Sequence, residues 1–172
     1  MREKEYDRKK AVAYAKKWAY LRNPRYYNFD NLGGDCTNFV SQCLYAGAKE
    51  MNYASNGWYY NSASDRSPSW TGVNPLHQFL TTNELVGPYG KEVDIDRIEV
   101  GDVAQLAFEK SYFTHTLLIV KIEKEKREDM SKLLLQDIYG ASHTFDSYER
   151  QLSTYRVSQI RSIHVEGVRT WN

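Results

Sequence analysis

The spacing of apolar residues changes along this chain, and that change restricts the fold more than any other feature of the sequence. Residues 7–22, 36–46 and 74–85 carry apolar side chains at helical spacing. From residue 93 onward the pattern becomes that of strands separated by turns, in the segments VAQLAFEK, FTHTLLIVKIE, KLLLQDIY and VSQIRSIHVEGV. Helices followed by a run of strands predict an α+β fold, in which N-terminal helices pack on a C-terminal antiparallel β-sheet.

Local signals define the ends of these elements. Asp7 is a candidate N-cap for the first helix, and Gly47 is positioned to cap the C-terminus of the second. Residues 48–75 have little periodicity, which predicts a long irregular loop. The charged stretch KIEKEKREDMSK predicts a solvated hairpin tip. Because 172 residues provide for one hydrophobic core, we expect a single domain, 1–172.

The charge balance and the hydropathy exclude several kinds of partner. Lysine and arginine number 23 against 22 acidic residues, so the net charge of +1 predicts no binding to nucleic acid or to an anionic membrane. No apolar run approaches the roughly 18 residues that span a bilayer, and the first residues, MREKEYDRKK, do not resemble a signal peptide. We therefore expect a soluble domain, cytoplasmic as given, or associated with the cell wall if it is cut from an exported precursor.

Two cysteines, Cys36 and Cys43, lie seven positions apart on the predicted second helix. Two helical turns separate them by roughly 10 Å, too far for a disulfide, so both are expected to be free thiols. The spacing also differs from the C-x₂₋₄-C of a zinc pair, and no competing cofactor motif is present, so we expect no metal and no cofactor. Cys43 lies on the apolar stripe of the helix, which predicts a structural role.

Cys36 opens the second helix, a position where the helix N-terminus and an imidazole lower the pKa of a thiol below about 8.5. Backbone N–H groups of the first turn would then stabilise an oxyanion. Among the four histidines, His115 is the best candidate for the base, because the apolar residues after it predict a rigid central strand. The alternative is that Cys36 fills a gap in the core.

The imidazole of His115 needs a partner that fixes its tautomer. Asp137 follows three leucines on the next predicted strand, where an unpaired carboxylate would be costly to bury, so the pattern favours Asp137 as that partner. Gln136 faces the other side of an ideal strand. The alternative is that neither residue takes part.

Aromatic residues are frequent, with 14 tyrosines and 4 tryptophans. Trp58, Tyr59 and Trp70 lie among Ser, Asn and Gly in the segment 48–75, which predicts a groove for a peptide or sugar-peptide chain. The alternative is that these rings fill the rim of a small core. We also expect Asp35, beside Cys36, to contact the substrate.

The segment NPRYYNFDNLGGDCTNFVSQCLYAGA closely resembles the opening of the bacterial putative amidase domain family, a branch of the papain-like NlpC and CHAP cysteine peptidases. Similar landmarks follow in GWYYN, SPSWTGVNPLHQFL, GDVAQLAF, THTLLIVK and SHTFDSYERQLS, so the resemblance covers nearly the whole chain. It implies a papain-like fold with Cys36 as nucleophile and His115 as base. Family members resemble one another in carrying a polar residue, often His, after the strand of the catalytic histidine, which implies His143 and ranks it ahead of Asp137.

The resemblance also implies a substrate, a peptide or glycopeptide such as peptidoglycan, because relatives in this superfamily cleave amide bonds in cell-wall peptides. The residues themselves favour a cysteine amidase or peptidase that works through an acyl-enzyme. Two alternatives stay open. One is an acyl or peptidyl transferase with the same dyad, and the other is a non-catalytic module that binds glycan or peptide through the aromatic loop 53–70.

Overall fold

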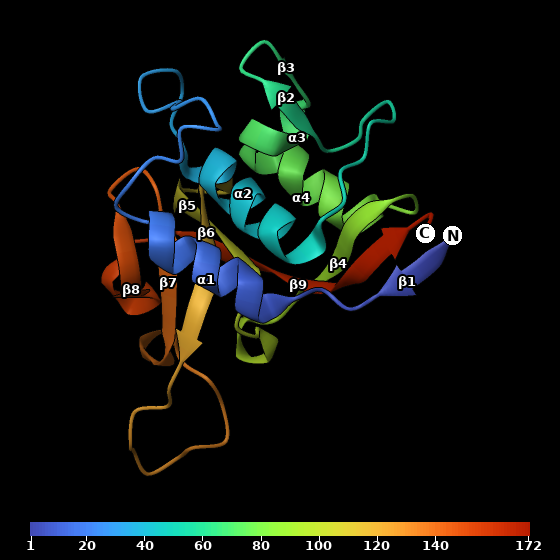
Figure 1. Cartoon of the computed structure of the whole chain (residues 1–172). Coiled ribbons are helices and arrows are strands. Elements are labelled where there is room, and N and C mark those ends of the chain that lie inside the picture. Colours follow the sequence, from blue (N-terminus) through green and yellow to red (C-terminus); the bar gives the residue numbers. More distant parts are fainter.

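A seven-stranded antiparallel β-sheet lies at the centre of the molecule, with the helices on one of its faces (Figure 1). The computed structural model describes all 172 residues. The strands are β1 (Arg2–Lys4), β4 (Gly87–Val93), β5 (Val103–Glu109), β6 (Tyr112–Ile122), β7 (Ile138–Ser142), β8 (Ser147–Gln151) and β9 (Gln159–Thr170). Their order is β1-β9-β5-β6-β7-β8, and β4 also pairs with β9. The predicted α+β architecture, N-terminal helices on an antiparallel sheet, is confirmed.

Three helices cover this face, α1 (Arg8–Trp18), α2 (Cys36–Ala48) and α4 (Val73–Thr82), and the short helix α3 (Pro68–Thr71) packs against α2 and α4. Asp7 caps α1 as predicted, since its Oδ1 accepts a hydrogen bond from the backbone N–H of Lys10 at 3.0 Å. Helix α2 is capped by Lys49 with a left-handed φ of 58°, so the prediction of Gly47 as the cap is wrong. Gly47 instead lies inside the helix. A Cβ there would sit 2.7 Å from the carbonyl oxygen of Asp7, so this close approach requires glycine.

Both faces of the central strands are covered by apolar side chains, which explains the uninterrupted apolar run in β6. Leu118 and Val120 pack against the helices in the larger cluster of buried residues. Leu117 and Ile119 face a second cluster on the opposite side of the sheet. Short 3₁₀ segments, η2 (Leu135–Asp137) and η3 (Leu152–Thr154), contribute to this second cluster, and η1 (Ile95–Arg97) lies at its edge.

Two predictions of local structure are wrong. The segment KLLLQDIY is not a continuous strand, because η2 occupies its middle and β7 begins only at Ile138. The segment 48–75 is not irregular throughout, because it holds α3 and a hairpin of two short strands, β2 (Tyr60–Ser62) and β3 (Asp65–Arg66). The long connection from β6 to η2, which contains most of the charged stretch, is exposed and extends away from the sheet (Figure 1).

Candidate active site

Cys36 is the first residue of α2, as the sequence predicts, and its side chain is 7% exposed. Gly33 and Gly34 precede it with φ of 89° and 99°, a backbone region that favours glycine, so the two glycines bring the chain sharply into the helix. The sulfur accepts hydrogen bonds from the backbone N–H groups of Thr116 and Thr37, and it lies 3.8 Å from Oγ1 of Thr37. The thiol therefore lies directly against strand β6.

Burial raises the pKa of the Cys36 thiol, and hydrogen bonds from Thr116 and Thr37 oppose that rise without cancelling it. The expected lowering of this pKa is therefore not found, and the thiol is protonated at neutral pH. A base must remove its proton as it attacks. Cys43 is completely buried in the core, and both cysteines are free thiols, as predicted.

His115 lies on β6 next to Thr116, so the peptide bond that joins these two residues lies at the Cys36 sulfur. Burial, and after it the charge of Arg150, lowers the pKa of His115 to about 4, which leaves the imidazole neutral and able to accept a proton at pH 7. The imidazole forms no hydrogen bond with the sulfur. Its ring instead lines a cavity of about 570 Å³ and lies 6.0 Å from the ring of Tyr155.

His143 is committed to partners other than His115. It follows β7, and its Nδ1 lies 2.5 Å from Oδ2 of Asp35, while its Nε2 lies 2.8 Å from the carbonyl oxygen of Trp18. Because a carbonyl only accepts, Nε2 carries a hydrogen and donates it. The ring also stacks on Phe39 at 4.1 Å. With both nitrogens engaged, His143 has none left to orient His115, so the structure contradicts that assignment.

Asp35 lies at the centre of a buried polar network. Its Oδ1 accepts hydrogen bonds from the backbone N–H of Phe29 at 2.8 Å and from Nδ2 of Asn38 at 2.9 Å. Its Oδ2 faces His143 and lies 3.6 Å from Nε of Arg22. Only 1% of Asp35 is exposed, so its side chain holds the loop before α2 in place. The expectation that Asp35 contacts the substrate does not agree with this burial.

Asp137 lies in a different part of the molecule from the thiol, at the base of the charged loop. Its oxygens accept four hydrogen bonds, from Glu125 N at 2.7 Å, from Arg127 Nη1 and Nη2 at 2.8 Å each, and from Leu134 N at 2.8 Å. Arg127 holds the pKa of this carboxyl well below its usual range. Asp137 therefore clamps the loop and does not orient His115. The neighbouring Gln136 donates to Oε2 of Glu125 at 3.2 Å and makes no contact with His115 either.

The two tryptophans expected in a substrate groove are core residues. Trp58 and Trp70 are completely buried, with ring centroids 4.7 Å apart. Their Nε1 atoms donate to side chains of α2, Trp58 to Oγ of Ser41 at 3.0 Å and Trp70 to Oδ1 of Asn38 at 2.9 Å. Polar residues of α2 thus receive the polar tips of the rings, and the groove prediction is wrong for both.

Tyr59 is half-buried and lines a cavity of about 520 Å³ that contains neither Cys36 nor His115. Its ring stacks on that of Tyr53 at 4.9 Å. A contact between Tyr59 and a ligand therefore remains a prediction.

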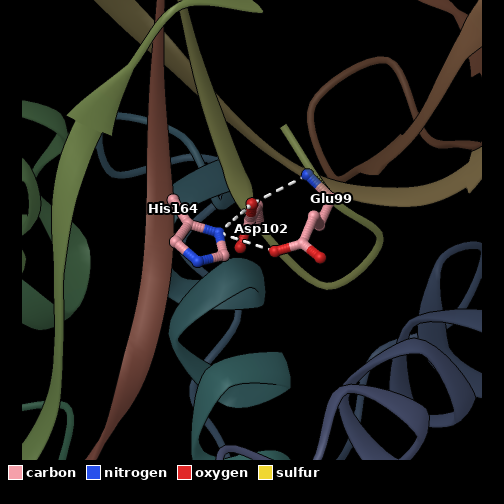
Figure 2. Close-up of side chains that lie close together, drawn as sticks. All are labelled: Glu99, Asp102 and His164. Carbon is pink, nitrogen blue, oxygen red and sulfur yellow. Dashed lines mark hydrogen bonds and ion pairs between the residues drawn. The ribbon is translucent and has the colours of Figure 1, made fainter. Parts of the chain in front are cut away.

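His164 belongs to a polar cluster with two acidic residues (Figure 2). Its Nδ1 lies 2.9 Å from Oδ2 of Asp102 and 3.1 Å from Oε2 of Glu99. Such a set could ligate a metal, but Arg8 already supplies a cation, with Nη1 2.7 Å from Oδ1 of Asp102. Asp102 also accepts hydrogen bonds from the backbone N–H of Glu99 and Val165. The cluster therefore joins α1, β5 and β9, and we assign it a structural role.

The residues that surround His115 were not predicted individually. Apart from His115 they are Phe108, Thr114, Thr144, Phe145, Arg150, Thr154, Tyr155 and Arg156. Several fall within the segment SHTFDSYERQLS, where the family resemblance was the only available signal. No local pattern indicates that β8 and the residues after it meet the start of β6.

The fold is of the α+β class, with a thiol at a helix start and a neutral imidazole on the adjacent strand. Comparison with known sequences identifies the family. The profile described as "Putative amidase domain" matches residues 5–166. The chain belongs to that family.

A relative is the uncharacterized protein YhbB of Bacillus subtilis (strain 168), 36% identical over 124 residues. The match covers 70% of this chain and 39% of YhbB, so the chain spans about two-fifths of the length of that relative. No solved structure matches the chain. None of the helices has the length and apolar character needed to cross a membrane.

Proposed function

We propose that this protein hydrolyses an amide bond, with Cys36 as the nucleophile and His115 as the base. The observation that carries the proposal is the position of Cys36. It is the first residue of α2, and its sulfur accepts a hydrogen bond from the backbone N–H of Thr116, the residue after His115. Membership of the amidase domain family supports the same reaction class.

The mechanism begins from a neutral thiol and a neutral imidazole. The His115 ring turns from its position near Tyr155 toward the sulfur, and it takes the thiol proton as the sulfur attacks the carbonyl carbon. His115 pairs with Leu106 on the face of the sheet opposite α2, so the start of β6 must shift as the ring turns toward the sulfur. The imidazolium then donates the same proton to the leaving amine, and water, deprotonated by His115, releases the acyl group.

The start of α2 supports oxyanion binding. Although Asp35 is the N-cap residue, its side chain makes no capping hydrogen bond and is turned toward His143 and Phe29. N–H groups of the first turn have no partner within the helix, and the helix dipole adds positive potential there. Apart from the Thr37 N–H, which bonds the Cys36 sulfur, these donors would stabilise the negative oxygen of a tetrahedral intermediate.

We further propose a peptide or glycopeptide substrate, with peptidoglycan as the candidate, on the strength of the family resemblance. The test is incubation of the wild-type protein with purified muropeptides, followed by mass spectrometry of the products. New fragments with free carboxyl and amine ends, absent with Cys36→Ala, are the expected result. A product joined to an added amine would instead assign the transferase alternative, and intact muropeptides at every pH tested would reject this substrate.

A further inference from the structure

The charged side chains that line the cavity around His115 are all positive. Nine residues line its volume of about 570 Å³, and these include two arginines, Arg150 and Arg156, but no aspartate or glutamate. Neither arginine forms an ion pair with any acidic residue of the chain, although most of the other buried or half-buried arginines do. The cavity therefore offers two cationic groups with no anion to satisfy them.

Arg150 is held in a fixed orientation. Its Nε donates to Oγ1 of Thr154 at 2.9 Å, its Nη2 donates to the carbonyl oxygen of Thr154 at 3.3 Å, and its guanidinium lies 3.8 Å from the ring centroid of Tyr155. A stacked guanidinium keeps its remaining N–H groups in the plane of the fork, ready for a planar acceptor. Arg156 is exposed and makes no side-chain hydrogen bond, so it is free to move onto a ligand.

A second observation points to a ligand in the same place. Tyr155 lines the cavity and is 9% exposed, and its hydroxyl is the one buried side-chain polar atom in the protein that has no hydrogen-bond partner. Buried polar groups of native proteins are nearly always paired, because leaving one without a partner in the interior is costly. A ligand that displaces the groups covering this hydroxyl would supply the missing partner.

The rim of the cavity is built for contact as well. Thr144 and Phe145, in the turn between β7 and β8, have φ of 61° and 60°, a conformation disfavoured for such side chains. The turn presents Phe145 with 82% of its surface exposed, and Phe108 of β5, which also lines the cavity, is 45% exposed. Two exposed rings at the mouth suit the apolar portion of a ligand whose charged group enters the cavity.

The cavity adjoins the thiol on two sides. Thr144 accepts a hydrogen bond at its Oγ1 from the backbone N–H of Asp35, the residue before Cys36. His115 precedes Thr116, whose N–H donates to the Cys36 sulfur. Two residues that line the cavity, Thr144 and His115, are thus linked to the immediate surroundings of the Cys36 sulfur, where the substrate amide would be cleaved.

We propose that this cavity binds a carboxylate of the substrate, held by Arg150, Arg156 and the hydroxyl of Tyr155, so that the enzyme selects amides with an acidic group next to the cleaved bond. This inference rests on the proposed amidase function and narrows it to anionic substrates. The charge of Arg150 is also one cause of the low pKa of His115. A carboxylate beside Arg150 offsets that charge and makes His115 a stronger base when substrate is bound.

Binding of small carboxylates, followed by nuclear magnetic resonance, tests the site without any need for turnover. Acetyl-alanine carries a terminal carboxylate, the α-amide of acetyl-aspartate carries a side-chain carboxylate, and acetyl-alaninamide carries neither. We expect the first or the second to shift the backbone amide signals of Thr144 and Tyr155, and the neutral compound to leave them unmoved. Which of the two carboxylates binds more tightly identifies the position of the acidic group in the substrate.

Matched variants make the test specific. Arg150→Gln and Arg156→Gln should each weaken binding roughly tenfold, as expected for loss of a charge-assisted hydrogen bond. Arg97→Gln removes the same charge from an exposed residue of η1 and should bind as the wild type does. If Arg150→Gln fails to fold, Arg156→Gln still decides the matter, because the Arg156 side chain supports no neighbour.

Equal binding of the neutral compound, or wild-type affinity in both arginine variants, would overturn the carboxylate site. Arginine-dependent binding by a protein that cleaves no muropeptide would instead count against the proposed muropeptide hydrolysis and leave the carboxylate site intact. Cleavage of muropeptides at unchanged kcat/KM in both arginine variants would reject the site alone.

Discussion

Nδ1 of His143 lies 2.5 Å from Oδ2 of Asp35, and Asp35 is the residue immediately before Cys36. Both side chains are 1% exposed and 108 positions apart in the sequence. This contact ties the turn after β7 to the start of α2. The position of the Cys36 thiol therefore depends on the buried pair of Asp35 and His143, neither of which is hydrogen-bonded to the sulfur.

We expect His143→Ala to destabilise the fold by about 3–5 kcal/mol, because it leaves the Asp35 carboxylate buried without its partner. The double variant Asp35→Ala/His143→Ala should lose less than the sum of the two single changes, as a pair in contact requires. Urea unfolding of the four proteins measures this coupling. Normal stability of His143→Ala with a large fall in kcat would restore the orienting role.

Cys36→Ala should abolish amide hydrolysis and leave the melting temperature close to that of the wild type, because the sulfur makes only weak hydrogen bonds, with the backbone N–H groups of Thr116 and Thr37 and with Oγ1 of Thr37 at 3.8 Å. Cys43→Ala is the matched control, since Cys43 is completely buried among apolar side chains and is remote from the helix start. It should lose some stability and retain most of its activity. Comparable hydrolysis by wild type and Cys36→Ala would falsify the mechanism.

In the free protein, Cys36 should react with iodoacetamide with a pH midpoint above the value of about 8.5 for an ordinary cysteine, because burial raises its pKa. The measurement is best made in the Cys43→Ala background, where one thiol remains. The same protein in denaturant supplies the reference midpoint. A midpoint well below the reference would mean that Cys36 and His115 form an ion pair after all.

Asp137→Asn should lower the melting temperature at pH 7 without changing kcat, because Asp137 clamps the charged loop through Arg127. The folded-state pKa of Asp137 is depressed, so its contribution to stability is complete above the unfolded value of about 3.9 and is lost as the pH falls further. The gap between wild type and variant should thus narrow in scans at pH 3. A gap that is constant with pH would exclude the ionised carboxylate as its source.

Trp70→Ala should cost about 3–5 kcal/mol of stability, as removal of a fully buried aromatic ring does. The loss includes the hydrogen bond from its Nε1 to Asn38. The surviving folded fraction should keep the KM of the wild type. A raised KM with unchanged stability, measured by thermal denaturation, would return Trp70 to the substrate groove.

The parts of this fold that depend on local pattern could be predicted, and the parts that depend on distant partners could not. Helix α1 and strand β6 follow from their periodicity, and Cys36 at a helix start follows from the residues around it. The apolar stripe of α2 accounts for only part of what the helix buries, since 12 of its 13 residues are buried. Asn38 and Ser41 are buried there because they bind the tryptophan rings from a later segment.

The same limit applies to the candidate site. A buried polar residue was correctly expected to be paired, but Asp137 has Arg127 as its partner and His143 has Asp35. Nothing local distinguishes those pairings from contact with His115. The strands β1, β4 and β8 were missed because their stability comes from neighbouring strands and not from an apolar pattern of their own.

Strand β1 pairs with β9, so Arg2 lies opposite Thr170. Side chains from both strands reach Glu50, just past the last turn of α2, through Lys4 and Thr170. Cys36 lies at the other end of that helix, roughly 18 Å away at 1.5 Å per residue. A surface tether or a fused protein joined at either terminus would accordingly leave the end of α2 that carries Cys36 uncovered. A short linker between the two termini would permit circular permutation without passing over that end of the helix.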